Sequence, residues 1–266
     1  MPGNTSPKTA YAQVNGLKMY YEIYGEGKPL VLIHGGGSTI KTSFGNIIPF
    51  LSKNRQIIAV ELQAHGHTGD RDADLTFEQD ADDIAELLKK LSIHKADFLG
   101  FSNGGQTLIE IALRHKNVVN KIILASIFYK RNGAVPGFWE GFDGVTLENM
   151  PQQLQDGFLE ANNDKAALLN MFNKDVQRMK SFKDWSDKDI KSIEARTLVI
   201  NGTADVGTVE HAVEMYRTIS NCELAIFPGG HGTYLGTIES LPNGIWPKFN
   251  AIYLIEEFLD GDSEKE

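Results

Sequence analysis

The residues with the clearest chemical potential lie in the stretch GFSNGG, residues 100–105. This stretch matches the pattern G-x-S-x-G and follows the apolar run 96–99, where a strand is expected to end and a helix to begin. In such a turn the serine takes a strained backbone position and its hydroxyl projects above the sheet, so the residues two before and two after it must be small. Gly100 and Gly104 meet this requirement, which predicts Ser102 as a nucleophile. The alternative is a glycine-rich turn without a chemical role.

A serine nucleophile needs a base that takes its proton and an acid that holds the base in the right tautomer. Asp205 follows the predicted strand 197–200, and His231 follows the predicted strand 224–227. The carboxyl ends of parallel strands meet at one edge of a sheet, where ligands bind, so both side chains are expected near Ser102. We therefore predict Ser102, Asp205 and His231 as the catalytic residues.

The assignment of Asp205 as the catalytic acid has two alternatives. The segment that follows the preceding strand, residues 125–130, contains no Asp or Glu and so offers no carboxylate. Asp205 itself could instead cap a helix that begins near Val206. Because the earlier position is empty of acids, the sequence favours Asp205.

A glycine loop, HGGGS at residues 34–38, follows the predicted strand 29–33. The tetrahedral intermediate of acyl transfer carries an oxyanion that needs preorganised N–H donors. We predict that the backbone N–H groups of Gly36 and Asn103 form this oxyanion hole, with Gly37 as the rival of Gly36. A phosphate-binding loop is the alternative, and it is disfavoured because no G-K-[ST] follows the glycines.

The elements that must position these residues alternate between short apolar runs and helical patterns. Near-continuous apolarity is typical of strands buried on both faces of a parallel sheet. Residues 11–14 and 18–23 instead alternate around Asn15-Gly16, which predicts an antiparallel edge hairpin. Together these patterns predict an α/β fold with a mostly parallel, doubly wound sheet. The other predicted strands are 29–33, 56–60, 96–99, 121–124, 197–200 and 224–227. The predicted helices are 77–91, 107–113, 211–219 and 247–259. The first of these begins with a capping box at Thr76 and Gln79, and the last has Pro247 in its first position.

The segment 127–192 breaks this alternation. It lacks runs typical of buried strands but is rich in aromatic residues and methionines, and the stretches 151–161 and 164–182 are compatible with helices. We therefore expect residues 1–126 and 193–266 to form one core and residues 127–192 to form an inserted helical lid. The apolar side chains of this lid predict an apolar substrate pocket.

The composition limits the partners of the chain. A formal net charge of −9 and a pI near 5.3 disfavour nucleic acid and acidic membrane surfaces. A single cysteine cannot form an intramolecular disulfide. No apolar run approaches the length of a membrane span, and the first residues do not resemble a secretion signal, so we expect a cytoplasmic protein. We also expect no cofactor, and either a monomer or a homodimer.

The histidines other than His231 do not predict a metal site. His65 and His67 are close in sequence, but no carboxylate or cysteine framework accompanies them, and a turn that lines the pocket is favoured instead. Three further histidines lie on segments that are expected at the surface: His94, His115 and His211.

The motifs at residues 34–37, 61–67, 100–105, 202–205 and 230–231 together resemble the α/β-hydrolase superfamily over nearly the whole chain. The serine turn and the lid position are similar to those of its capped esterase, lactonase and C–C hydrolase branch, rather than the hormone-sensitive-lipase branch. Where the family usually has Asp-x-Arg-Gly-x-Gly, this chain has ELQAHGH at 61–67, a departure at the pocket rim. A serine at the turn argues against haloalkane dehalogenases and epoxide hydrolases, which the resemblance associates with an aspartate nucleophile.

We therefore expect a cofactor-free serine hydrolase that acts through an acyl-enzyme on small to medium carboxylic esters, thioesters or lactones with an apolar acyl group. The same groups can serve a C–C bond hydrolase, a perhydrolase or cofactor-free oxygen chemistry. Outside the enzymes, the alternative is a hydrolase-fold ligand receptor with little turnover.

Overall fold

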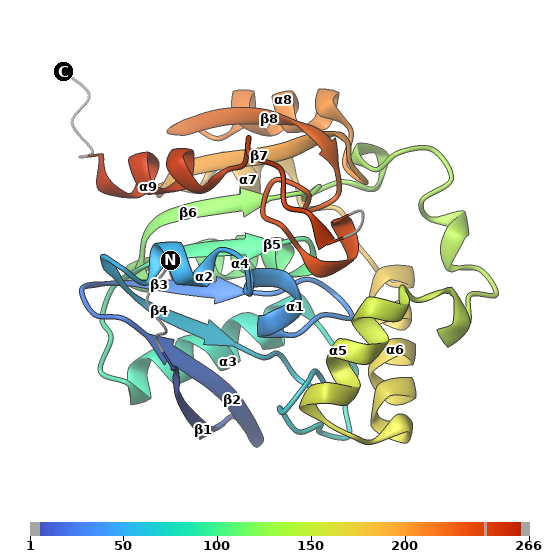
Figure 1. Cartoon of the computed structure of the whole chain (residues 1–266). Coiled ribbons are helices and arrows are strands. Elements are labelled where there is room, and N and C mark those ends of the chain that lie inside the picture. Colours follow the sequence, from blue (N-terminus) through green and yellow to red (C-terminus); the bar gives the residue numbers. More distant parts are fainter. Residues whose placement is uncertain (1–5, 242–243, 262–266) are drawn as a thin grey trace.

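The strands of the protein form one eight-stranded sheet in the order β1-β2-β4-β3-β5-β6-β7-β8 (Figure 1). The structure is a computed structural model that describes residues 6–241 and 244–261. β2 pairs antiparallel with β1 and β4, and the remaining neighbours are parallel, which confirms the predicted mostly parallel sheet with an edge hairpin. The hairpin turn has positive φ at both Asn15 and Gly16, as its sequence predicts. The strands are β1 (Lys8–Val14), β2 (Leu17–Tyr24), β3 (Lys28–Ile33), β4 (Arg55–Val60), β5 (Ala96–Phe101), β6 (Val119–Ala125), β7 (Arg196–Ala204) and β8 (Cys222–Gly230).

Helices cover both faces of the sheet, as Figure 1 shows. One group of helices packs with the sheet in one apolar cluster, and a second group packs with it in another cluster on the opposite face. Within the described ranges, no helix is both long enough and apolar enough to cross a bilayer. The first group is α3 (Phe77–Lys90), α4 (Asn103–Arg114), α7 (Asp187–Lys191) and α8 (Val209–Thr218), and the second is α1 (Ile40–Phe44), α2 (Ile48–Leu51) and α9 (Ile252–Asp260).

Successive residues of the central strands contribute to opposite clusters. In β5, Phe98 packs with the cluster of α3 and α4, whereas Leu99 packs with the cluster of α1 and α9. Ile122 and Ile123 divide in the same way in β6. Because side chains alternate across a strand, a strand that is covered on both faces needs apolar residues at every position. This is the physical reason for the continuous apolar runs in the sequence.

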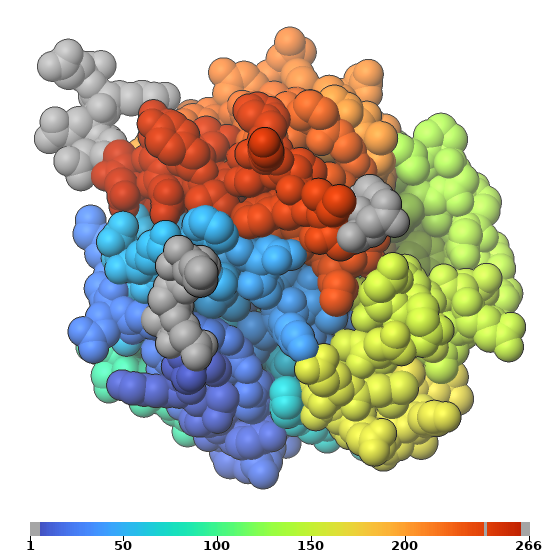
Figure 2. Space-filling view, viewed as in Figure 1, coloured from blue at the N-terminus to red at the C-terminus, as the bar shows by residue number. Residues whose placement is uncertain are grey.

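The chain leaves the sheet after β6 and returns to it at β7. Between them, the inserted segment (residues 127–192) contains helices and short turns but no strand of the sheet. Its helices α5 and α6 lie beyond the carboxyl ends of the strands in Figure 1, and their yellow atoms form one flank of the molecule in Figure 2. The helices of the segment are α5 (Gln152–Ala161), α6 (Lys165–Lys180) and α7 (Asp187–Lys191). Among the described residues, 3-10 turns occur at Lys116–Val118, Arg131–Gly133, Glu140–Phe142, Leu147–Asn149 and Ile238–Ser240.

Two predicted helix starts are wrong. α9 begins at Ile252 rather than at Pro247, because the Asn250 side chain accepts the Ile252 N–H and donates to the Pro247 carbonyl, which forms a local turn in place of a helical one. α4 begins at Asn103, directly after Ser102, and not at residue 107. The glycines at its start lower the intrinsic helix propensity there, and tertiary packing overrides that preference.

Two smaller predictions also need correction. Thr76 caps α3 by accepting the Gln79 N–H, but the Gln79 side chain donates to Asp83, so only half of the capping box forms. His211 is buried instead of exposed: its Nε2 accepts the Tyr129 N–H at 3.1 Å and its Nδ1 donates to Glu214 at 2.9 Å. The local sequence around His211 does not predict that Glu214 and Tyr129 become its hydrogen-bond partners.

Candidate active site

Ser102 occupies the turn between β5 and α4 with φ 52° and ψ −127°. This left-handed conformation is rare for a residue other than glycine, and it agrees with the strained serine turn that the sequence predicts. A Cβ at Gly100 would lie 2.4 Å from the Gly104 carbonyl oxygen, and one at Gly104 would lie 2.1 Å from the Ile33 carbonyl oxygen. Only glycines therefore allow the backbone around Ser102 to close.

Asp205 and His231 form a hydrogen-bonded pair at the carboxyl ends of β7 and β8. His231 Nδ1 lies 2.7 Å from Asp205 Oδ1. A carboxylate accepts hydrogen bonds only, so Nδ1 carries the proton and Nε2 of the neutral ring is left with a free lone pair. Asp205 is not a helix cap, because α8 begins at Val209 and Thr208 is its N-cap.

His231 lies beside the serine turn. The rings of His231 and Phe101, the residue before Ser102, are 4.7 Å apart between centroids. Within the described part of the chain no hydrogen bond joins Ser102 Oγ to His231. Hydrogen bonds of this kind are often long in ligand-free sites and tighten when substrate binds. The structure therefore brings the base next to the serine turn in an orientation set by Asp205.

Asp205 is held by four donors. Besides His231, its carboxylate accepts the N–H groups of Gly202 at 2.9 Å and Val206 at 2.7 Å and the hydroxyl of Ser126 at 2.5 Å. Burial alone would raise the pKa of Asp205, but the hydrogen bonds and charge of His231, together with those of Ser126 and Gly202, lower it below its ordinary value. Asp205 is thus an ionised acceptor for the histidine.

Ser126 is a site residue that the sequence reasoning missed. It follows β6, at the place where the acid was sought and not found, and it has φ 56°. Its hydroxyl donates to Asp205 and also lies 2.7 Å from the hydroxyl of the buried Tyr234. The available signal is its position directly after β6, where the sequence offers a hydroxyl in place of a carboxylate.

The glycine loop at residues 34–38, where the sequence predicts the oxyanion hole and which is called the oxyanion loop below, follows β3 and faces the serine turn. Gly36 and Asn103 line the same cavity as Ser102. No described residue accepts the Gly36 N–H, and the N–H groups at the start of a helix, such as that of Asn103 in α4, have no acceptor within the helix. The Gly37 N–H, in contrast, donates to the Asp175 carboxylate at 2.6 Å. This occupied amide rules out Gly37 as the rival donor in this conformation.

His34 orients the Gly36 amide. His34 Nδ1 donates to the Gly35 carbonyl at 2.7 Å, and His34 Nε2 accepts the Leu62 N–H at 3.0 Å. The carbonyl of Gly35 and the N–H of Gly36 belong to one trans peptide and point in opposite directions. Complete burial, with the nearby His65 charge, lowers the pKa of His34 to about 3, so its ring stays neutral and can fill both roles.

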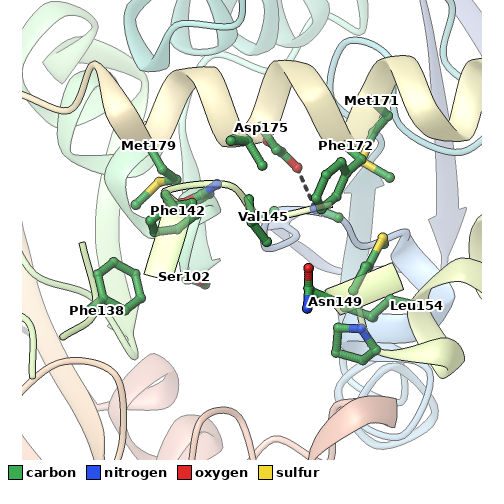
Figure 3. Close-up of a pocket in the computed structure, with 16 residues that line it drawn as sticks. Ser102, Phe138, Phe142, Val145, Asn149, Leu154, Met171, Phe172, Asp175 and Met179 are labelled. Carbon is green, nitrogen blue, oxygen red and sulfur yellow. Dashed lines mark hydrogen bonds between the residues drawn. The ribbon is translucent and has the colours of Figure 1, made fainter. Parts of the chain in front are cut away.

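Asp175 of α6 is the second residue that the sequence reasoning missed. Its Oδ2 accepts from Gly37 and lies 2.9 Å from His65 Nε2, while its Oδ1 accepts from Arg178 at 2.5 Å. The dashed line in Figure 3 marks the bond from Asp175 to the Gly37 amide. Burial opposes ionisation, but the charges of His65 and Arg178 outweigh it and lower the pKa of Asp175. No local pattern in the sequence links α6 to the oxyanion loop.

His65 is cationic in this arrangement. Its Nδ1 lies 2.8 Å from the Gln63 carbonyl, which only accepts, so Nδ1 carries a proton. Its Nε2 faces the ionised Asp175, which also only accepts, so Nε2 carries a proton as well. Burial by itself would lower the pKa of His65, but the Asp175 charge and hydrogen bond raise it. The prediction that the turn at 65–67 lines the pocket is wrong, because none of its residues is in the described lining of the cavity. The turn lies behind the oxyanion loop and supports it through Asp175.

The metal alternative for this turn finds no support. His67 Nδ1 pairs with Glu61 at 3.0 Å, while His65 pairs with Asp175, so the two histidines face different carboxylates. Among the residues that the structure describes, no three His, Cys, Asp or Glu side chains are grouped in a way that could hold a metal ion.

A cavity of about 240 Å³ opens between Ser102 and the inserted segment. Figure 3 shows aromatic and aliphatic side chains around it, with Asp175 on one wall. Among the described residues of this lining, Asp175 is the one ionisable side chain, and none is Lys or Arg. The lining consists of Gly36, Gly37, Ser102, Asn103, Phe138, Phe142, Val145, Asn149, Met150, Pro151, Leu154, Met171, Phe172, Asp175, Val176 and Met179.

Two relatives match the sequence over different lengths. A 2-hydroxymuconate semialdehyde hydrolase from Pseudomonas sp. (strain CF600) is 26% identical over 247 residues, which cover 83% of this chain and 86% of that protein. A 2-hydroxy-6-oxo-6-(2'-aminophenyl)hexa-2,4-dienoic acid hydrolase from Metapseudomonas resinovorans is 27% identical over 117 residues, and this match spans 43% of the chain but only 40% of that protein.

A solved structure and a family model agree on the fold. The meta-cleavage product hydrolase from Pseudomonas fluorescens IP01 superposes with a TM-score of 0.77 at 24% identity, over 94% of this chain and 97% of that one, a likeness of fold alone. The family model for the alpha/beta hydrolase fold matches residues 28–169, which is more than half of the 266 residues. The chain therefore belongs to the alpha/beta hydrolase fold family.

Proposed function

We propose that this protein is a serine hydrolase that cleaves neutral, apolar carboxylic esters, thioesters or lactones through an acyl-enzyme. The observation that carries the proposal is a strained serine at an apolar cavity, next to a histidine whose tautomer is already set by an ionised carboxylate. A nucleophile, a base and an orienting acid are the minimum set for nucleophilic acyl transfer.

The proposed reaction has two halves. Ser102 Oγ attacks the carbonyl carbon while His231 Nε2 takes its proton, and Asp205 stabilises the imidazolium that forms. The bond to the leaving group breaks as His231 returns the proton to it, which leaves the acyl group on Ser102. Water then gives a proton to His231 and attacks the acyl-enzyme, and the acid departs as Ser102 regains its proton.

The developing oxyanion is assigned to the N–H groups of Gly36 and Asn103. The Gly36 amide has no described acceptor, and it lines the cavity together with Asn103 and Ser102. Donors that are held in place before the reaction stabilise an oxyanion without reorganisation, and removing one typically costs about 10²–10³ in rate. Gly37 is excluded from this role by its bond to Asp175.

The charge of the cavity supports a neutral substrate. A carboxylate on the substrate would enter a space whose described lining offers no Lys or Arg, and Asp175 is already paired with His65 and Arg178. Burying a charge without a partner is costly. The inserted segment then acts as a lid that supplies the apolar walls around an uncharged acyl group.

C–C bond hydrolysis is the second candidate. The match to the 2-hydroxymuconate semialdehyde hydrolase, which extends over most of both chains, favours it. A dienoic acid, which the name of the other relative describes, carries a carboxylate, and the cavity has no cation to receive one. The charge of the cavity is thus the feature that separates the two candidates.

The first experiment measures turnover of p-nitrophenyl esters and simple lactones of increasing acyl length. Ser102→Ala is compared with wild type and with Ser192→Ala, a change at an exposed serine after α7. We expect Ser102→Ala to lower kcat by about 10⁴ or more and the control to leave it unchanged. Equal activity of wild type and Ser102→Ala would contradict the nucleophile.

A matched substrate pair separates the candidates. A 2-hydroxy-6-oxo-2,4-dienoate tests C–C hydrolysis, and a neutral ester of similar size tests the proposal. Preferred turnover of the dienoate would overturn the ester assignment while keeping the catalytic residues. Binding of these compounds with no turnover of either would favour a ligand receptor.

A further inference from the structure

We propose that Asp175 is a positioning residue through which the docked helix α6 of the inserted segment sets the oxyanion loop in its working conformation. The inference rests on the proposed function, because it assumes an oxyanion that the loop must bind. Asp175 is 8% exposed and bridges three partners from three parts of the chain: Gly37, His65 and Arg178.

The first step of the argument is the geometry of two consecutive peptides. The peptide that joins Gly36 to Gly37 is held at its N–H by Asp175. The preceding peptide, which joins Gly35 to Gly36, is held at its carbonyl by His34. The Gly36 N–H lies between these two anchors, so its direction depends on both. Releasing Asp175 frees one of them, in a loop whose Gly37 has φ 67° and can rotate easily.

The second step is charge. An ionised carboxylate near an oxyanion hole opposes the negative charge that develops there. Here Asp175 is paired with the imidazolium of His65 and with Arg178, and Arg178 Nη1 also donates to Asp80 of α3 at 2.8 Å. These four residues are at most 8% exposed. The cluster thus supplies a strong acceptor for Gly37 while two buried cations offset its charge.

The third step is the location of Asp175 on α6, which belongs to the inserted segment and not to the helices that cover the sheet. α6 is tied to the core by this cluster and, at its outer side, by Lys174 Nζ, which donates to the Asp70 carboxylate at 2.7 Å. If α6 moves away from the core, Gly37 loses its acceptor and His65 loses its counter-charge at the same time. Closure of the inserted segment over substrate and completion of the oxyanion hole are therefore one event.

The central test is Asp175→Asn, which preserves the shape of the side chain but removes its charge. The matched control is Asp156→Asn on α5, an exposed carboxylate of the same segment. We expect Asp175→Asn to lower kcat for a p-nitrophenyl ester by about 10-fold or more while KM changes by less than about 3-fold, since a misplaced donor weakens only the transition state. The inhibition constant of an alkylboronic acid, which forms a tetrahedral adduct on serine, should rise by the same factor as kcat/KM falls.

Two outcomes would overturn the proposal. A lower melting temperature with unchanged kcat and unchanged boronic acid affinity would make Asp175 merely structural. A change in KM alone would make it a substrate contact instead of a positioning residue. Asp156→Asn should show neither effect.

A further measurement does not depend on activity or on the stability of a variant. In the wild-type protein, NMR should show that both ring nitrogens of His65 stay protonated to a higher pH than in a free imidazole and that the Gly37 amide is protected from hydrogen exchange. In Asp175→Asn the Gly37 amide should exchange faster. A neutral His65 or an unprotected Gly37 amide in wild type would contradict the inference. If no ester is turned over at all, the proposed function fails, and these two signals still decide whether the anchor exists.

Discussion

Ser126 Oγ lies 2.5 Å from Asp205 Oδ2, so the residue after β6 binds the carboxylate that follows β7. The end of β6 is one of the two places from which an acid can reach the base in this architecture. Here that position is Ser126, whose hydroxyl donates to Asp205 and lies 2.7 Å from the hydroxyl of Tyr234. Ser126 after β6 and Asp205 after β7 thus belong to one hydrogen-bonded unit with His231.

Ser126→Ala should lower kcat by about 3- to 10-fold with little change in KM. The alanine removes a hydrogen bond to a charged group, and such bonds contribute roughly 1.5–3 kcal/mol, of which only part appears in the transition state. Steady-state kinetics on a p-nitrophenyl ester measure the effect, with Ser192→Ala as the control. Unchanged kcat in a folded Ser126→Ala protein would mean that three donors suffice for Asp205.

Asp205→Asn should lower kcat by about 10⁴, because an amide favours the wrong tautomer of His231. Adding Ser126→Asp to that variant places a carboxylate at the end of β6, and it should restore at least about 10-fold of the lost activity. Asp tolerates the positive φ of this position better than most residues do. If the double variant folds and recovers nothing, a carboxylate at 126 does not reach His231.

Gly36→Ala should lower kcat by about 10²–10³, which is the effect of losing one oxyanion donor. A Cβ at Gly36 would lie 2.5 Å from Asn103 Nδ2 and 3.3 Å from Asp175 Oδ2, so the loop or the α4 start must shift. Gly141→Ala is the matched control, because nothing lies within 4 Å of a Cβ there. Comparable kcat values for the two variants would argue against Gly36 as a donor.

The ion pair between His65 and Asp175 predicts a pH-dependent stability. The pKa of His65 is raised in the folded state, so its contribution is complete below the ordinary imidazole pKa of about 6.5 and is lost as pH rises through the raised value. The pKa of Asp175 is lowered, so its contribution is present above about 3.9 and is lost as pH falls through the lowered value. The other charged or titratable groups that interact with His65 are Arg178, His34 and Asp80, and burial raises the pKa of Asp80 to about 6.

Urea unfolding of wild type and His65→Gln at several pH values tests this expectation. The stability advantage of wild type should be largest between about pH 4 and 6.5 and should shrink at higher pH. Groups that do not interact with His65, such as His67, are common to both proteins and cancel in the difference. Asp80 does not cancel, because the His65 charge lowers its pKa, so its titration belongs to the effect that is measured. An advantage that is constant or grows with pH would mean that His65 is neutral in the folded protein.

Phe172→Ala should shift the preferred acyl chain to longer substrates. Phe172 lines the cavity and is only half-buried, so its removal enlarges a cavity of about 240 Å³ at a modest cost in stability. The ratio of kcat/KM for long and short p-nitrophenyl esters measures the shift, and truncating the exposed Tyr253 to Ala is the control. An unchanged ratio would place the acyl group elsewhere.

Much of the framework follows from local rules. The apolar runs at 29–33, 96–99 and 197–200 all became buried parallel strands, because residues that face two clusters must be apolar at every position. The glycines around Ser102 predicted the turn, since their close backbone contacts leave no room for a Cβ. The division into a core and an inserted lid stays a prediction about domains, although residues 127–192 add no strand to the sheet.

The sequence by itself determined the strands, the serine turn, and the positions of Asp205 and His231, because each depends on residue types at fixed spacing along the chain. Only the tertiary structure decided which groups complete the site. Ser126 reaches Asp205 across 79 residues, and Asp175 reaches Gly37 across 138. A buried polar group must form hydrogen bonds, and its partners are the donors or acceptors that the packing of distant elements brings within reach. No periodicity or spacing in the sequence predicts which residues these are.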